Sequence, residues 1–133
     1  MVKYTFATLD QWTKKTEKRI DAVLKDATQS VVAVAQTSRD HGGRMPVITN
    51  NLRDSLESSI AGGASGEGES SHILVAPLMK GGDLATFTWT AEYAAAVNNG
   101  NRGRPGAHFV EGAVDQWPAI VRASIRKAKV AVG

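Results

Sequence analysis

The stretch that first decides the fold is residues 9–38, which read LDQWTKKTEKRIDAVLKDATQSVVAVAQTS. Apolar side chains recur in it at steps of three and four, which places them on one stripe of a helix. The stripe consists of Trp12, Ile20, Val23, Leu24, Ala27, Val31, Val34 and Ala35. Thr8 or Asp10 is a suitable cap for its start, and His41-Gly42-Gly43 predicts its end. We expect a long helix whose second half, VVAVA, is more deeply buried than its charged first half.

Strand patterns follow in the middle of the chain. Residues 84–90, LATFTWT, alternate between two faces, as a half-buried strand does. Residues 72–76 also predict a strand, and residues 79–83, with two glycines, predict the turn that joins the two. Residues 58–61 are a candidate third strand. Residues 61–71, AGGASGEGESS, have few hydrophobic side chains and predict a mobile loop.

The last third of the chain predicts helices around a second loop. Residues 91–97 indicate a short helix, and residues 98–108, NNGNRGRPGAH, indicate a loop. Residues 109–129 carry another apolar stripe at helical spacing. Pro118 interrupts that stripe, so we expect a kink or two consecutive helices, with Asp115 as the N-cap of the second.

Together these elements predict an α+β fold, in which a long N-terminal helix and a C-terminal helix pack on a small antiparallel sheet. The 133 residues fit a single domain spanning 1–133, and 42% of them are apolar, enough for one core. Thr49 to Leu56 remains open between a short helical turn and the approach to a strand.

Composition excludes several kinds of function. The chain has no cysteine, so it forms no disulfides, thiolate metal sites or cysteine nucleophiles. We expect no signal peptide and no membrane-spanning segment, because no apolar run is long enough. The net charge of +3 is too small to indicate nucleic-acid binding by itself.

A search for catalytic chemistry finds no convincing arrangement. His41, His72 and His108 fall in three segments without metal-ligand spacing. Glu67 and Glu69 lie in the glycine-serine loop, which does not provide the fixed, desolvated position that a general acid needs. No serine lies in a nucleophile-elbow pattern, G-x-S-x-G. We therefore expect no catalytic residues, no metal and no cofactor, and we do not expect an enzyme.

Two further features leave alternatives open. Asn101, Arg102 and Arg104 form a basic loop that suits either phosphate contacts or a protein–protein contact through arginine. Trp12, Trp89 and Trp117 are expected in the core. A tryptophan found exposed instead would indicate a subunit interface.

Three segments, in order, resemble one protein family. The first is MPVITNNLRDSL, residues 45–56, which resembles a signature of proline-valine, threonine-glycine, leucine-arginine and serine-isoleucine. The second is AEYAAAV with Asn99-Gly100, which resembles a tyrosine-alanine, valine, acid-x-glycine signature. The third is HFVEGA, residues 108–113, which is similar to the opening of the family's last helix. The family is that of the tail-component, or head–tail joining, proteins of long-tailed phages, some of which are called neck, tail-completion or tail-terminator-like proteins.

The chain departs from the family pattern at two places. Asn50 stands where the family usually has glycine, and asparagine tolerates the left-handed backbone that such a turn needs. Asn98 or Asn99 replaces the usual glutamate before Gly100. If that glutamate makes a salt bridge between subunits, this chain lacks it.

The resemblance implies a structural virion protein at the head–tail junction, with no catalytic role. Such subunits form rings, commonly sixfold, between connector or stopper proteins and the tail tube, assembled in the host cytoplasm. DNA passes through the ring without sequence-specific binding, and no membrane is involved. Candidate interface residues are Glu67, Glu69, Asn101, Arg102, Arg104, Arg53 and Tyr93. The alternative is a standalone nucleic-acid-binding module that uses the basic loop and the C-terminal helix.

Overall fold

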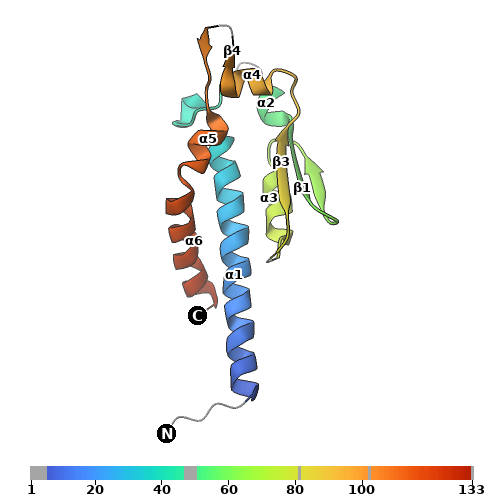
Figure 1. The fold of residues 1–133 in the computed structure, drawn as a ribbon, viewed down its shortest axis with the longest axis vertical. Coiled ribbons are helices and arrows are strands. Elements are labelled where there is room, and N and C mark those ends of the chain that lie inside the picture. Colours follow the sequence, from blue (N-terminus) through green and yellow to red (C-terminus); the bar gives the residue numbers. More distant parts are fainter. Residues whose placement is uncertain (1–5, 47–50, 81, 102, 133) are drawn as a thin grey trace.

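A long helix organises the molecule (Figure 1). The computed structural model describes residues 6–46, 51–80, 82–101 and 103–132. In chain order the helical elements are α1 (Phe6–Ala35), η1 (Arg39–His41), α2 (Asn51–Asp54), α3 (Ser71–Val75), η2 (Ala76–Leu78), α4 (Ala94–Asn99), α5 (Phe109–Val114) and α6 (Trp117–Val132). The strands are β1 (Leu56–Ile60), β2 (Ser65–Glu67), β3 (Ala85–Trp89), β4 (Gly100–Asn101) and β5 (Arg104–Pro105). The α+β prediction, with long helices near both ends and a small antiparallel sheet between them, is confirmed.

The two long helices α1 and α6 run side by side in opposite directions (Figure 1). Small side chains make the contact: Ala27 on α1 is 1% exposed, and Ser124 and Ala128 on α6 are also buried. The Ser124 hydroxyl donates a hydrogen bond of 2.7 Å to Asp26 Oδ2, and Lys127 Nζ lies 3.3 Å from Asp26 Oδ1. Because the residues at the contact are small, the two backbones approach closely and larger apolar side chains lie beside the contact.

The three-stranded sheet has the order β2-β1-β3, and both pairings are antiparallel. Leu56, Ser58 and Ile60 alternate on the buried face of β1. Helix α3 packs against that face, where the Ser58 and Ser71 hydroxyls form a buried hydrogen bond of 2.8 Å. The η2 turn then contacts α1, so α3 and η2 connect the sheet to the long helix.

Two hydrophobic clusters form the core. The larger one lies at the C-terminal end of α1, and its buried members are Ala35, Met45, Leu52, Ala94, Ala107, Phe109 and Ala113. Trp89 packs against it, with its ring 5.2 Å from Phe109 in an edge-to-face arrangement. The smaller cluster joins Ile60, Val75 and Met79 to the side of α1 at Leu24.

The sequence analysis assigned two segments of the sheet region wrongly. Residues 72–76, predicted as a strand, lie in helix α3 and the start of η2. Their β-branched and apolar content suits a strand, but the buried positions Ser71, His72, Val75 and Ala76 follow helical spacing. Residues 79–83 therefore join η2 to β3 and do not connect two strands.

The second wrong assignment concerns residues 61–71, predicted as a mobile loop, which contain strand β2. Gly66 pairs with Ser58, and a Cβ atom there would lie 3.5 Å from Val75 and 3.6 Å from Ser71. A Cβ atom at Gly66 would thus be in ordinary van der Waals contact with α3, so the strand packs on α3 although its composition suggested a loop.

The boundaries of the helices were predicted more closely, except for the start of the long helix: α1 begins at Phe6, so the expected caps Thr8 and Asp10 lie inside it. The long helix ends at Ala35, before the expected glycines, and Gly42 ends the η1 turn with a φ of 85°. The expected break near Pro118 is confirmed, since α5 ends at Val114 and α6 begins at Trp117. Pro118 is the second residue of α6, where a missing backbone donor removes no helical hydrogen bond. The prediction that Asp115 caps the start of the second helix is wrong, because Asp115 lies at the C-cap of α5, two residues before α6 begins.

Truncation of the buried face of β1 should lower stability strongly. Leu56 is fully buried at 0% exposure, so we expect Leu56→Ala to reduce the free energy of unfolding by about 2–5 kcal/mol through lost burial and a cavity. Leu84, 69% exposed, is the matched control, and Leu84→Ala should change the value by less than about 0.5 kcal/mol. Urea unfolding of both variants measures the difference. Equal losses would contradict the assigned packing.

Candidate functional site

The structure places the predicted interface residues in two separate regions. Arg53, Glu67 and Glu69 lie beside the sheet, in α2, in β2 and before α3. Tyr93, Asn101 and Arg104 belong to the end of the molecule that carries α4 and the β4-β5 hairpin, whereas Arg102 lies outside the described residues (Figure 1). The six of these residues that the structure describes therefore come from two groups of elements.

Arg53 and Glu69 meet beside the buried amide of Gln36. Arg53 Nη2 lies 3.9 Å from Glu69 Oε2, and both side chains are partly exposed, so the pair contributes little to stability. The Gln36 Nε2 donates hydrogen bonds of 3.0 Å to the carbonyl oxygens of both residues. A cavity of about 440 Å³ lies here, lined also by His41 and His72. Gln36 was not identified from the sequence, because its partners lie 17 and 33 residues away.

Glu67 contributes to an acidic outer face of the sheet. It pairs directly with Glu57 across β1 and β2, and both side chains are exposed. Like charges directly opposite on neighbouring strands repel each other. Any partner that brings a positive charge to this face would relieve the repulsion.

The hairpin of β4 and β5 stands at one end of the molecule (Figure 1). Its register pairs Asn101 with Arg104, and Gly103 in the turn between them has a φ of 79°. The backbone thus places both predicted residues on adjacent short strands. Tyr93, at the start of α4, is 44% exposed.

Asn98 fixes the base of this hairpin. Its buried side chain donates a hydrogen bond of 2.9 Å to Glu111 Oε1 and accepts one of 3.1 Å from the Val110 backbone amide. It therefore satisfies a free amide in the first turn of α5, a role that a local cap residue usually has. The sequence alone did not indicate this role: there Asn98 is only one of two residues that replace the family's usual glutamate before Gly100.

The electrostatics around α5 follow from the same contact. The hydrogen bond from Asn98 holds the pKa of Glu111 below its ordinary value, and nearby His108 acts in the same direction. His108 Nδ1 lies 3.4 Å from Glu111 Oε2. His108 itself has a φ of 51°, so the chain enters α5 through a left-handed residue.

Removal of the Asn98 amide should loosen the hairpin from α5. We expect Asn98→Ala to lower the free energy of unfolding by about 1–3 kcal/mol, because the Val110 amide loses its acceptor in a buried position. The adjacent, exposed Asn99 is the control, and Asn99→Ala should have a smaller effect. Thermal or urea unfolding measures both. A larger loss for Asn99→Ala would contradict the assigned role.

The three histidines lie in different surroundings. His41 accepts or donates a hydrogen bond of 2.9 Å with Ser38 Oγ, closing the η1 turn. His72 is 4% exposed, and its Nδ1 has no hydrogen-bond partner. Within the described part of the chain, no group of three or more His, Cys, Asp or Glu side chains is arranged to hold a metal ion.

The burial of His72 makes stability depend on pH. Desolvation lowers the pKa of His72 below its ordinary value, so the unfolded chain takes up a proton before the folded one does. The free energy of unfolding should therefore fall as pH decreases below about 6.5, by at most about 1.4 kcal/mol per pH unit from this group.

Urea unfolding between pH 7.5 and 5 tests this dependence. His72→Gln should weaken the pH dependence, and it is compared with His41→Gln, a substitution at an exposed histidine. An unaltered slope in the His72→Gln variant would contradict the assigned role of burial.

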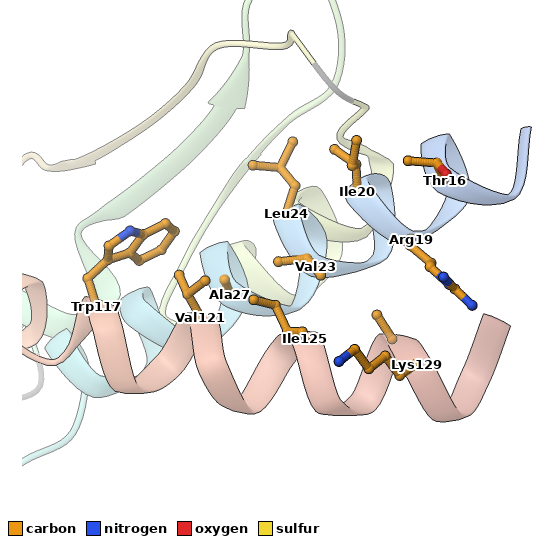
Figure 2. A pocket seen from close by; sticks show the side chains of 11 residues that line it. Thr16, Arg19, Ile20, Val23, Leu24, Ala27, Trp117, Val121, Ile125 and Lys129 are labelled. Carbon is orange, nitrogen blue, oxygen red and sulfur yellow. The ribbon is translucent and has the colours of Figure 1, made fainter. Parts of the chain in front are cut away.

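An apolar groove runs along α1 and α6 (Figure 2). Its volume is about 520 Å³, and we call it the α1–α6 groove. It is lined by Thr16, Arg19, Ile20, Val23, Leu24, Ala27, Trp117, Val121, Ile125, Ala128 and Lys129. Figure 2 shows Trp117 at one end and Arg19 with Lys129 at the other.

The groove corrects one expectation about the tryptophans. Trp89 packs against the core as predicted, and its Nε1 donates a hydrogen bond of 2.8 Å to Gln36 Oε1. Trp117 is 39% exposed in the groove, so its predicted place in the core is wrong. The reason is that α6 contacts α1 through Ser124 and Ala128, which leaves Trp117 beside the contact. The side chain of Trp12 lies outside the described residues.

A second exposed apolar surface lies on α3 and η2. Ile73, Leu74 and Leu78 are 48%, 72% and 59% exposed, and we call this surface the α3 ridge. It forms because the opposite side of the helix, with Ser71, His72 and Val75, is already buried in the molecule. Large apolar side chains gathered in exposed patches indicate interaction surfaces.

Two remaining observations bear on function. None of the helices in the described ranges combines the length and apolar character needed to cross a membrane. Comparison with protein-family models, curated proteins and solved structures found no match.

Proposed function

We propose that the chain is a structural subunit of the head–tail junction of a long-tailed phage or phage-like particle, where copies form a ring that completes or terminates the tail and joins it to the head. The observation that carries the proposal is the exposure of large apolar side chains on two surfaces of a small domain, the α1–α6 groove and the α3 ridge. A subunit that functions by assembly needs such surfaces, since they become buried against neighbours.

The segments that resemble the phage family also meet in space. Met45 and Leu52 come from the first segment, Ala94 from the second, and Phe109 and Ala113 from the third. All five are buried in the larger hydrophobic cluster. The three segments that carry the resemblance therefore pack against one another in one cluster, which supports interpreting them as a single signature.

A second candidate is a nucleic-acid-binding module, favoured by the charge of α6. Residues 117–132 contain four basic side chains, Arg122, Arg126, Lys127 and Lys129, and no acidic one. Lys127 is paired with Asp26. Such a module would bind DNA with an affinity that falls steeply as salt rises. The two apolar surfaces have no role in that function, so we favour assembly.

Electron microscopy of particles made without this chain tests the proposal. A virus or prophage that encodes the chain should yield full heads and finished tails that remain separate when the gene is deleted. Abnormally long tails would indicate a terminator within the same proposal. A plasmid copy of the gene should restore joined particles. Normal, infectious particles from the deletion would contradict the proposed function.

A further inference from the structure

A buried histidine lies where α3 meets the end of the long helix. His72 is 4% exposed, and its Nδ1 has no hydrogen-bond partner among the described residues. Its side chain lines the cavity of about 440 Å³ together with Ala33 and Gln36. A neutral imidazole has one N–H donor, whereas a protonated imidazole has two and carries a full charge. Protonation would therefore create a buried charge with a donor that lacks an acceptor, which is costly.

The charged groups on the same cavity do not compensate that charge. Arg53 on α2 and Glu69, just before α3, carry opposite charges 3.9 Å apart, so they largely offset each other. His41 on η1 also lines the cavity, and its Nδ1 is hydrogen-bonded to Ser38 Oγ. A proton on His72 would thus meet one cation, one anion that is already paired and a second histidine.

The elements that pack on α3 supply no further charged partner within the described residues. Glu57 on β1 and Glu67 on β2 are exposed on the face of the sheet that points away from α3. Residues 27–35 at the end of α1 and residues 76–78 of η2 contain no charged side chain. The protonated ring therefore gains solvation only by leaving its buried position.

Helix α3 is held by few buried side chains. It has five residues, and of its apolar side chains Val75 is buried, whereas Ile73 and Leu74 are 48% and 72% exposed. A short segment with little buried apolar surface opens at a lower free energy than the whole fold. The contact of α1 with α6 is made elsewhere, through Ala27 and Ser124, which do not line this cavity.

We propose that α3 is a pH-sensitive switch: protonation of His72 releases α3 from the end of α1, while α1 and α6 stay paired. The inference goes beyond the loss of global stability expected at low pH, because it names a local opening. It concerns the chain by itself and does not depend on the proposed function.

The direction of the pH dependence follows from which state takes up the proton first. Burial holds the pKa of His72 below its ordinary value while α3 is closed. In the open state the ring is in water, where the pKa of histidine is about 6.5. The open state therefore binds the proton at a higher pH than the closed state, so opening becomes more favourable as pH falls through this value. Between pH 7.5 and 5.5 the equilibrium constant for opening should rise about three- to tenfold.

Hydrogen exchange followed by NMR tests the switch in the full chain. The Ala76 amide donates to the His72 carbonyl oxygen, so its exchange reports the opening of α3. The amides of Ser124 and Ala128, at buried positions of α6, report global unfolding. After correction for the intrinsic exchange rate, Ala76 should be less protected than the α6 amides at pH 7.5. It should lose a further factor of about three to ten by pH 5.5.

Variants identify the group that titrates. His72→Gln should remove the pH dependence of the Ala76 exchange. His108→Gln is the control and should retain it, because His108 lies at the start of α5, outside the cavity. The ¹⁵N signals of the His72 ring in the unsubstituted chain give a second readout that needs no variant, and their apparent pKa should lie below about 6.5.

Three results would overturn the inference. The first is equal protection of Ala76 and the α6 amides at both pH values, which would mean that α3 opens only with the whole fold. The second is a change in Ala76 protection of less than about twofold. The third is the same pH dependence in His72→Gln as in the unsubstituted chain.

Discussion

The buried amide of Gln36 is the contact on which the placement of the sheet against the long helix depends. Its Nε2 donates to the carbonyl oxygens of Arg53 and Glu69, and its Oε1 accepts from Trp89 Nε1. One side chain, directly after α1, thereby holds α2, the residues before α3, and β3. Trp89 extends the connection to Phe109 on α5. Loss of this amide would leave several buried polar groups without partners, each at a cost of about 1–3 kcal/mol.

This arrangement explains why apolar surface remains exposed. The sheet unit is held by Gln36, directly after α1, and by the contact of Leu24 with the smaller cluster. Helix α6 packs on α1 through the small residues near Ala27 and Ser124. Trp117 and Ile125 therefore line an open groove, and the side of α3 that faces away from the molecule stays uncovered. The exposed surfaces follow from how the elements pack, and assembly with further copies would bury them.

Sequence patterns correctly predicted the elements that depend mainly on residues near one another in the chain. The stripe of α1, the alternation at Phe87 and Trp89, and the break near Pro118 are examples. Helix α3 was missed because a short run such as HILVA fits a buried strand and a buried helix equally well. The site residues were harder to predict from the sequence, because Gln36 and Asn98 form hydrogen bonds with residues distant in the chain. Arg53 and Glu69 were selected from the sequence, but their proximity depends on the fold.

The most direct test of the central claim is a reconstruction of the phage particle by electron cryo-microscopy. The account predicts a closed ring of this chain between the portal side of the head and the tail tube. Density for the chain elsewhere in the particle, or its absence from purified particles, would contradict the account.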